Sequence, residues 1–349
     1  MSGGEAMQKK QVDEDVELLA LTTQKFLSGN PSILVGSGCS VPYGLPTMGK
    51  LAEEIVSVLN QKFETEPSWI EFVSQLKATQ NLESALEAVA MKDSIHDEII
   101  RVVWECITRC DNSAFLSFLQ NGQFPDISKI IAKCVQTAAK TNIITTNYDR
   151  LIEYSIDEAV GKCNSGFSGN YIKKFIGFDA SPSKRAVNLF KVHGSIDWFK
   201  NNEYGSTFSM DLKESSLIGQ KFSPMIVTPG NRKYKETHND PFRTVIAEAD
   251  KAMRESSSYL CIGYGFNDEH IQPIIIDENR SKKKPVVIVT KGITQKMIDL
   301  FHANIDYPCL IITENEQNGG ATVYFNTDDC KIYEQPFWKV NEFTKLWLG

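Results

Sequence analysis

The sequence lacks any apolar stretch long enough to cross a bilayer, which takes about 20 consecutive apolar residues. Its first five residues, Met1 to Glu5, contain no apolar signal region. We therefore expect a soluble, cytoplasmic protein that makes no use of a membrane.

Paired cysteines are also lacking. The eight cysteines are scattered along 349 residues and form no C-x-x-C pair. Cys106 and Cys110 lie four residues apart on a predicted helix, but no further partners follow at metal-ligand spacing. We expect reduced, mostly buried thiols and no metal site.

Basic residues are too few for a chain whose main work is to bind nucleic acid. The 37 lysines and arginines are outnumbered by 44 acidic residues, for a formal charge of −7. Proteins that grip phosphate backbones usually have the opposite balance. We expect no direct nucleic-acid binding.

What is present is led by one stretch near the start of the chain. The apolar run Ile33 to Val35 is typical of a buried strand, and it leads into Gly36-Ser37-Gly38-Cys39-Ser40. The glycines permit a tight turn, and backbone N–H groups before the helix that begins near Gly49 can bind an anion. A plain tight turn is an open alternative, because Val41 stands where a dinucleotide fingerprint has its third glycine.

Two later strands end in polar residues. Residues 142–146 form an apolar strand that turns into Asn147-Tyr148-Asp149, and residues 187–192 form one that delivers His193-Gly194. In open α/β sheets, ligands bind at the carboxyl ends of parallel strands, so these side chains are candidate site residues. The alternatives are that Thr146 or Asn147 only caps a helix and that His193 is structural.

A fourth segment repeats the pattern of the first. Residues 258–262 read as a strand, and Gly263-Tyr264-Gly265 follows as a second Gly-x-Gly turn. Asn267 or Asp268 can cap the helix after it.

Strands alternate with helices through most of the chain, which predicts an α/β fold with a Rossmann-like, doubly wound parallel sheet. Glycine is absent between Gly49 and Gly122, and apolar residues recur there at helical spacing, which predicts a helical insertion subdomain. The expected organisation is a mobile N-terminus over 1–12 and a single domain over 13–349, with its core at about 30–50 and 140–300, the insertion at about 51–139, and late strands and a tail at about 301–349. Within the core we expect an irregular loop over 161–186, a further strand end at 224–230 and a helix over 295–304.

Taken together, the four segments resemble, in the same order, the motifs of the sirtuin (SIR2) superfamily. Residues 36–40 are similar to its Gly-Ala-Gly-x-Ser loop for NAD, and residues 145–149 to its Thr-Gln-Asn-x-Asp motif. His193-Gly194 matches its catalytic His-Gly, and residues 263–268 resemble the turn that contacts the ribose and phosphate side of NAD. The resemblance covers roughly residues 15–295.

Departures from the sirtuin pattern point to one branch. The four-cysteine zinc module of sirtuin deacylases is missing, and Thr146 replaces the motif's glutamine. The first loop continues into Gly44-Leu45-Pro46-Thr47, which is close to the form found in bacterial SIR2-like effectors. These effectors hydrolyse NAD, and many act in anti-phage defence by abortive infection.

The resemblance implies a role for each matching residue. It implies NAD+ as substrate, no metal, Asn147 to orient the ribose and the attacking water, and His193 as general base. The residues it implies for NAD binding are Gly36, Ser37, Gly38, Cys39, Ser40, Thr146, Asp149, Gly263, Gly265 and Asn267. Asp149 could equally be a structural anchor.

Two alternatives stay open for the function. One is an NAD-dependent protein deacylase or ADP-ribosyltransferase, which the missing zinc cysteines disfavour. The other is a non-catalytic sensor of NAD or ADP-ribose, which would need neither Asn147 nor His193. Because an unrestrained NAD hydrolase would kill its own cell, we expect control by a homo-oligomer, by a second defence-system protein, or by both.

Overall fold

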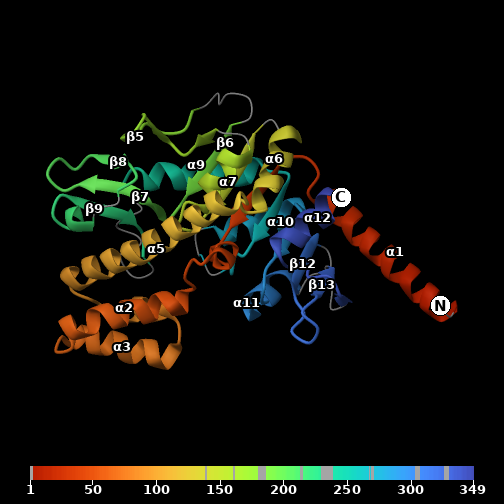
Figure 1. Cartoon of the computed structure of the whole chain (residues 1–349), viewed down its shortest axis with the longest axis horizontal. Helices are drawn as coiled ribbons and strands as arrows, with labels where there is room; N and C mark the ends of the chain where they lie inside the picture. The colour runs from red at the N-terminus through yellow and green to blue at the C-terminus, as the bar shows by residue number, and fades with distance from the viewer. Residues whose placement is uncertain are drawn as a thin grey trace.

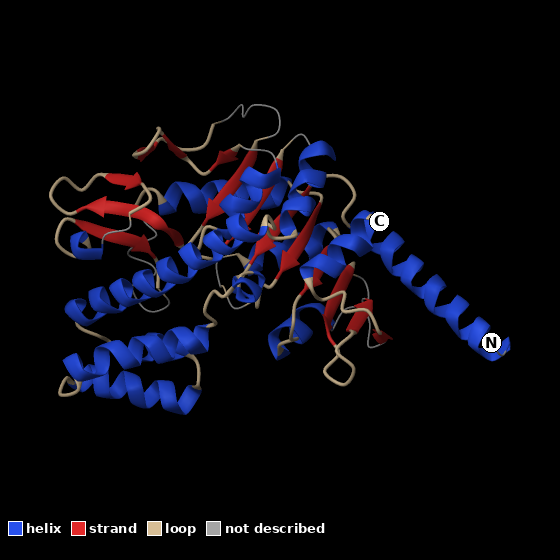
Figure 2. Cartoon of the chain, viewed as in Figure 1, coloured by secondary structure: helices blue, strands red, loops and turns tan. Residues whose placement is uncertain are grey.

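The computed structural model describes most of the chain, and Figures 1 and 2 show its arrangement. The described residues are 3–137, 140–159, 162–179, 186–212, 215–228, 239–266, 268, 271–302, 307–325 and 330–349.

A large, mainly parallel sheet forms the centre of the molecule. Within the described residues it has nine strands, in the spatial order β14-β13-β12-β11-β10-β1-β2-β6-β3. Their bounds are β1 Pro31–Val35, β2 Thr141–Thr145, β3 Cys163–Asn164, β6 Val187–Lys191, β10 Ser258–Ile262, β11 Val286–Val289, β12 Cys309–Glu314, β13 Ala321–Phe325 and β14 Cys330–Tyr333. In this sheet, neighbouring strands from β3 at one edge across to β12 pair in parallel, whereas β13 and β14 pair antiparallel at the other edge.

The strand order places a ligand-binding crevice next to β1. Six parallel strands form the core of the sheet, in the spatial order β6-β2-β1-β10-β11-β12. If these six are renumbered 1 to 6 along the chain, the order is 3-2-1-4-5-6, which is the order of the Rossmann fold. The chain leaves β1 toward β2 on one side and later returns to pair β10 on the other. In such sheets the crevice opens where the order reverses, at the carboxyl ends of β1 and β10. The predicted fold class is confirmed.

Helices cover both faces of this sheet, as the alternation in β1 requires. Ile33 and Val35 pack into one apolar layer, and Leu34 packs into the opposite one. The first layer includes α6 (Ile127–Thr137), α7 (Leu151–Ala159) and α12 (Val340–Leu348), and the second includes α9 (Phe242–Glu255) and α10 (Gln272–Lys282). A strand buried on both faces needs apolar side chains pointing both ways, which explains the continuous run in the sequence.

The segment between β1 and β2 is helical in the structure. It contains α2 (Met48–Phe63), α3 (Pro67–Thr79), α4 (Leu82–Ala88), α5 (Asp93–Asn121) and α6. Figure 1 shows α2 and α3 side by side, away from the sheet, with the long helix α5 running back toward it. The Thr47 hydroxyl accepts the Lys50 amide at 3.3 Å and caps the start of α2.

A second, antiparallel sheet corrects two of the sequence predictions. It has the order β4-β5-β8-β7-β9, with bounds β4 Phe167–Ser168, β5 Lys173–Phe175, β7 Gly194–Asn201, β8 Thr207–Ser209 and β9 Phe222–Ile226. The loop predicted over 161–186 therefore contains β3, β4 and β5. The strand end predicted at 224–230 belongs to β9 of this sheet. Residues 160–161, 180–185, 229 and 230 lie outside the described part. Strands β3, β4 and β5 have two or three residues each, which is too few for an alternation of apolar and polar residues to be visible in the sequence.

The remaining elements lie toward the ends of the chain. Helix α1 (Gly3–Phe26) begins well before its apolar periodicity does and extends away from the body of the molecule (Figure 1). Its Gln24 Nε2 donates to the Trp347 carbonyl in α12 at 3.2 Å. The helix predicted over 295–304 is α11 (Gln295–Met297) followed by a π-helical turn over Ile298–His302, and 303–304 are outside the described residues. No described helix is both long and apolar enough to cross a membrane.

Candidate functional site

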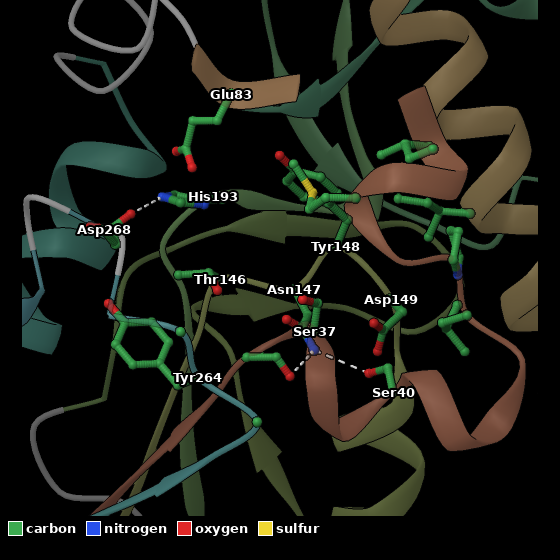
Figure 3. Close-up of a pocket in the computed structure, with 18 residues that line it drawn as sticks. Ser37, Ser40, Glu83, Thr146, Asn147, Tyr148, Asp149, His193, Tyr264 and Asp268 are labelled. Atoms are coloured by element: carbon green, nitrogen blue, oxygen red, sulfur yellow. Dashed lines mark hydrogen bonds and ion pairs between the residues drawn. The ribbon is translucent and has the colours of Figure 1, made fainter. Parts of the chain in front are cut away.

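A cavity of about 210 Å³ lies at the carboxyl ends of β1, β2, β6 and β10, where the strand order reverses (Figure 3). Nine of the residues predicted from the sequence line it: Gly36, Ser37, Ser40, Thr146, Asn147, Asp149, His193, Gly263 and Gly265. Two polar strand ends and two glycine turns, read separately along the sequence, therefore meet at one place. An apolar wall is completed by residues that follow the first loop, Leu45, Pro46, Met48 and Leu51, and by Ile107 of α5.

The two Gly-x-Gly turns pack backbone against backbone. The Gly36 amide donates to the Ile262 carbonyl, and the Gly38 amide donates to the Gly263 carbonyl, each at 3.0 Å. A Cβ on Gly36 would lie 2.4 Å from the Gly263 oxygen, and one on Gly263 would lie 2.3 Å from the Cys39 nitrogen. Glycine is thus required here for the contact between the two turns as well as for any approach of a ligand.

Most amides of the first loop are already engaged within the protein. Besides Gly36 and Gly38, the Cys39 amide donates to the Gly36 carbonyl at 3.0 Å and the Ser40 amide to the Ser37 carbonyl at 2.9 Å. A phosphate bound here would therefore meet the amide and hydroxyl of Ser37. Fewer amides of this loop are therefore available to bind an anion than the sequence suggested.

Two of the predicted binding residues lie behind the cavity, and one is outside the described part. Gly38 and Cys39 do not line the cavity; the Cys39 side chain is 2% exposed and packs in the apolar core. Burial, with a smaller contribution from Asp149, raises the pKa of the Cys39 thiol to about 12, which makes it an unreactive thiol. Asn267 lies outside the described residues.

Asn147 is held in one orientation by the first loop. Its side-chain nitrogen donates to the Gly36 carbonyl and to Ser40 Oγ, both at 3.1 Å (Figure 3). Both amide hydrogens are committed to these acceptors. The side-chain oxygen of Asn147 is therefore the atom that can accept a hydrogen bond from a ligand hydroxyl or from water.

Asp149 connects the cavity to a buried lysine. Its Oδ1 accepts the Leu151 amide at 3.1 Å, at the start of α7, and its side chain also bonds Ser40. Burial raises the pKa of Asp149, and the positive charge of Lys191 opposes that rise. Lys191 is fully buried and donates to the Asp149 carbonyl and, at 2.8 Å, to Glu153 Oε1. Asp149 is thus both an anchor of α7 and a cavity residue.

His193 projects into the cavity from a bend that only glycine permits. Gly194 has a φ of +85°, and a Cβ there would lie 1.9 Å from the Met225 oxygen of β9. His193 Nε2 lies 2.7 Å from Asp268 Oδ2, and Asp268 is itself 6% exposed. Asp268 Oδ1 accepts the Ile271 amide at 3.1 Å, so the predicted cap before α10 is also the partner of the histidine.

Sequence reasoning missed four polar residues of the site: Glu83, Tyr148, Tyr264 and Asp268. Glu83 enters from α4 of the insertion, and Tyr264 and Asp268 come from the second glycine turn and the residues after it. Figure 3 shows the carboxylates of Glu83 and Asp268 on two sides of His193. Tyr264 and Asp268 lay within a motif already singled out, whereas nothing in the local sequence marks Glu83.

The charge of the lining is one-sided. Its charged residues are Glu83, Asp149 and Asp268 together with His193, and the described lining holds no lysine or arginine. Among the residues open to description, no group of three or more His, Cys, Asp or Glu is placed to hold a metal ion.

Comparison with known proteins gives one match in sequence. A protein-family model described as a SIR2-like domain matches residues 141–304, which include Asn147, His193 and the second glycine turn. No curated protein matches the chain. The stretch from β2 to α11 is therefore SIR2-like in sequence.

Solved structures of the same kind are similar at low identity. One, described as "Structural Basis for the Mechanism and Regulation of Sir2 Enzymes", is 15% identical, with 81% of this chain and 89% of that chain covered and a TM-score of 0.41. Another, "Crystal structure of a Sir2 homolog–NAD complex", is 13% identical, with 83% and 86% covered and a TM-score of 0.42.

Proposed function

We propose that this chain, SIR2-like over residues 141–304, is an NAD+ hydrolase that cleaves NAD+ to nicotinamide and ADP-ribose. One observation carries the proposal. Asn147 and His193 leave different strands and line a single cavity beside the glycine loop, at the switch point of a Rossmann-type sheet. These are the two positions at which the sequence resembles the catalytic motifs of sirtuins.

The reaction breaks the bond between the ribose C1′ and the nicotinamide nitrogen, which keeps the electron pair. Water forms the new bond to C1′ and gives up a proton. A catalyst must orient the ribose and water, take the proton, and stabilise positive charge at C1′.

The proposed roles follow from the contacts of each side chain. Asn147, with its nitrogen fixed on Gly36 and Ser40, offers its oxygen to the ribose or the water. His193 takes the proton as general base. Asp268 Oδ2 lies 2.7 Å from Nε2 of this histidine and would stabilise the ring once it has taken the proton.

We place the activity in anti-phage defence, as an abortive-infection effector controlled by a partner protein, by oligomerisation, or by both. The support is the likeness of Gly44-Leu45-Pro46-Thr47 to the form found in bacterial SIR2-like effectors. In this proposal the purified protein alone is slow, and infection releases the full rate.

The test is NAD+ loss with production of nicotinamide and ADP-ribose, in purified protein and in phage-challenged cells. Asn147→Ala and His193→Ala should each lower the rate by about 100-fold or more, the usual scale for a lost general base. Asn121→Ala, on the exposed end of α5, is the matched control and should leave the rate unchanged.

Other outcomes would replace the proposal. NAD+ consumption that requires an acyl-lysine peptide would make the protein a deacylase, and consumption that requires an acceptor protein would make it an ADP-ribosyltransferase. Binding of NAD+ or ADP-ribose with no loss in purified protein or challenged cells would make it a sensor.

A further inference from the structure

We infer that Asp111, on helix α5 of the insertion, is a positioning residue that acts through Arg150 to set the place of Asn147 in the cavity. The inference rests on the proposed function, because that function gives Asn147 the task of orienting the ribose. Asp111 does not line the cavity, so its effect on a ligand passes through the protein.

The first step is the short turn that carries Asn147. Residues 146–150 join β2 to α7. On the β2 side, the Asn147 amide donates to Thr145 Oγ1 at 3.1 Å. On the α7 side, the Arg150 amide donates to Asp111 Oδ1 at 2.7 Å. The turn is therefore fixed at its far end by a side chain from another part of the chain.

The second step is the number of donors that converge on Asp111. Its Oδ2 accepts Arg150 Nε at 3.0 Å, Arg150 Nη2 at 2.7 Å and the Tyr154 hydroxyl at 2.7 Å. Asp111 is 1% exposed, so water does not replace these partners. Both oxygens of a carboxylate accept hydrogen bonds, whereas an amide of the same size must turn its NH₂ group toward one set of donors. An ionised carboxylate is therefore required here, and asparagine would break part of the arrangement.

The third step is how α5 reaches the turn. Ile107, one helical turn before Asp111, lines the cavity, so one face of α5 meets both the cavity and the turn. Trp104, a further turn back, donates to the Ile196 carbonyl at 2.7 Å, and the Ile196 amide donates to the Tyr148 carbonyl at 3.0 Å. The helix thus supports the turn directly at Arg150 and, through β7, at Tyr148.

The fourth step separates position from stability. The Arg150 side chain is 14% exposed, and its Nη1 also bonds Asp211, whose side chain is 44% exposed. Desolvation offsets much of the attraction within a buried ion pair, so such a pair is a weak source of net stability. What the bonds to Asp111 define is one location for the Arg150 backbone and, through the turn, for Asn147.

The experiment is a double-mutant cycle, measured by calorimetry on the full-length protein with two probes. The carbocyclic analogue of NAD+ keeps the ribose hydroxyls but cannot be cleaved, and ADP lacks both that ribose and the nicotinamide. Asn147→Ala and Asp111→Asn should each weaken binding of the analogue about fivefold, the scale of one hydrogen bond, and change binding of ADP by less than about twofold. In the double variant the loss should stay near fivefold, because a displaced Asn147 and an absent one are equivalent for the ligand.

Asp211→Asn is the matched control, since it removes a carboxylate from the same arginine but leaves the bond to the Arg150 amide in place. It should change both affinities by less than about twofold. Asp111→Leu combined with Arg150→Met removes both charges together with the acceptor for the amide. It should reproduce the loss for the analogue, and it keeps the test open if Asp111→Asn does not fold, because no buried charge is left unpaired. Circular dichroism and thermal melting check that each variant is folded.

The outcomes separate this inference from the proposed function. If the Asp111 variants weaken both probes equally, or neither, or if their loss adds in full to that of Asn147→Ala, positioning by Asp111 is wrong. An equal loss in Asp211→Asn, or a wild-type protein that does not bind the analogue, overturns it as well. If the cycle behaves as expected but the wild-type protein never cleaves NAD+, the inference stands and the hydrolase proposal fails.

Discussion

Gly263 shows how a single residue can hold two parts of a site together. Its φ of +57° is a conformation that side chains rarely adopt, and its α-carbon lies against the backbone of Gly38 and Cys39. The Gly38 amide also donates to its carbonyl. A change at this residue therefore disturbs the loop after β1 as much as its own turn.

We predict that Gly263→Ala lowers the free energy of unfolding by at least about 2 kcal/mol, from the left-handed conformation and the clash together. It should also abolish NAD+ binding, because Gly36 and Ser37 would shift. Urea denaturation and calorimetry measure the two effects. Gly292→Ala is the control, since Gly292 has open space around its α-carbon, and a stability loss of similar size there would refute the explanation.

Among single residues, the sequence predicted the cavity residues Asn147 and His193, which directly follow apolar strands, and missed Glu83, which does not. Asn147 and His193 could be found because each comes directly after an apolar run whose carboxyl end must open at the crevice. Glu83 could not be found, because it lies on a helix of the insertion, and its approach to the sheet depends on how the helices pack. Asp268 was predicted only as one of two possible helix caps, with Asn267, and its approach to His193 is a tertiary contact that the sequence does not encode locally.

Among the elements, β6 is notable for ending in a buried charge. Lys191 is 0% exposed, and its ammonium group bonds the carbonyl of Asp149 and the carboxylate of Glu153. Burial raises the pKa of Glu153 to about 7, and the nearby ammonium limits the rise. The lysine thereby ties the end of β2 to the start of α7 at the residues that line the cavity.

Lys191→Met is expected to lower the free energy of unfolding by about 3 kcal/mol, because it leaves a partly buried carboxylate and the Asp149 carbonyl without their partner. Lys200→Met, on an exposed position of β7, should change it by less than about 0.5 kcal/mol. Both are measured by urea denaturation. A Lys191 variant within about 1 kcal/mol of the wild type would show that the bonded lysine has no net stabilising role.

Elements with a long apolar run could be predicted, and short paired ones could not. Strands β1, β2, β10 and β11 are fully buried, so their composition alone identifies them. The second sheet has several very short strands, and its pairing of β5 with β8 joins Lys173 to Ser209, which local sequence patterns do not reveal. Strand β14, which has three exposed residues, and helix α12 were not predicted either.

In the molecule as a whole, the insertion is fixed to the sheet by buried polar contacts. Asp111 of α5 is 1% exposed and accepts Arg150 Nη2 at 2.7 Å. Trp104 of the same helix donates from Nε1 to the Ile196 carbonyl of β7 at 2.7 Å. These contacts fix the insertion relative to the sheets. The cavity is therefore bounded by α4 of the insertion on one side and by the strand ends on the other.

This arrangement predicts that binding slows hydrogen exchange in both parts. The carbocyclic NAD+ analogue should increase protection of amides in α4 (82–88) and in the loop 36–40, because it contacts both. Mass-spectrometric exchange with and without the analogue makes the measurement, with α12 as an internal control that should not change. Protection confined to the strand-end loops would mean that the insertion takes no part in binding.

The interlocked glycine turns also have a consequence for how the protein is made. The two turns lie about 230 residues apart, so at 5–20 residues per second roughly 10 to 50 seconds pass between the synthesis of one and the other. Until β10 has emerged from the ribosome, the loop after β1 lacks the backbone it rests on and Asp268 is not yet present. A nascent chain thus carries Asn147 for about 120 residues of synthesis, and His193 for about 75, before the turn that completes the cavity exists. The proposed activity can appear only after that turn has been made.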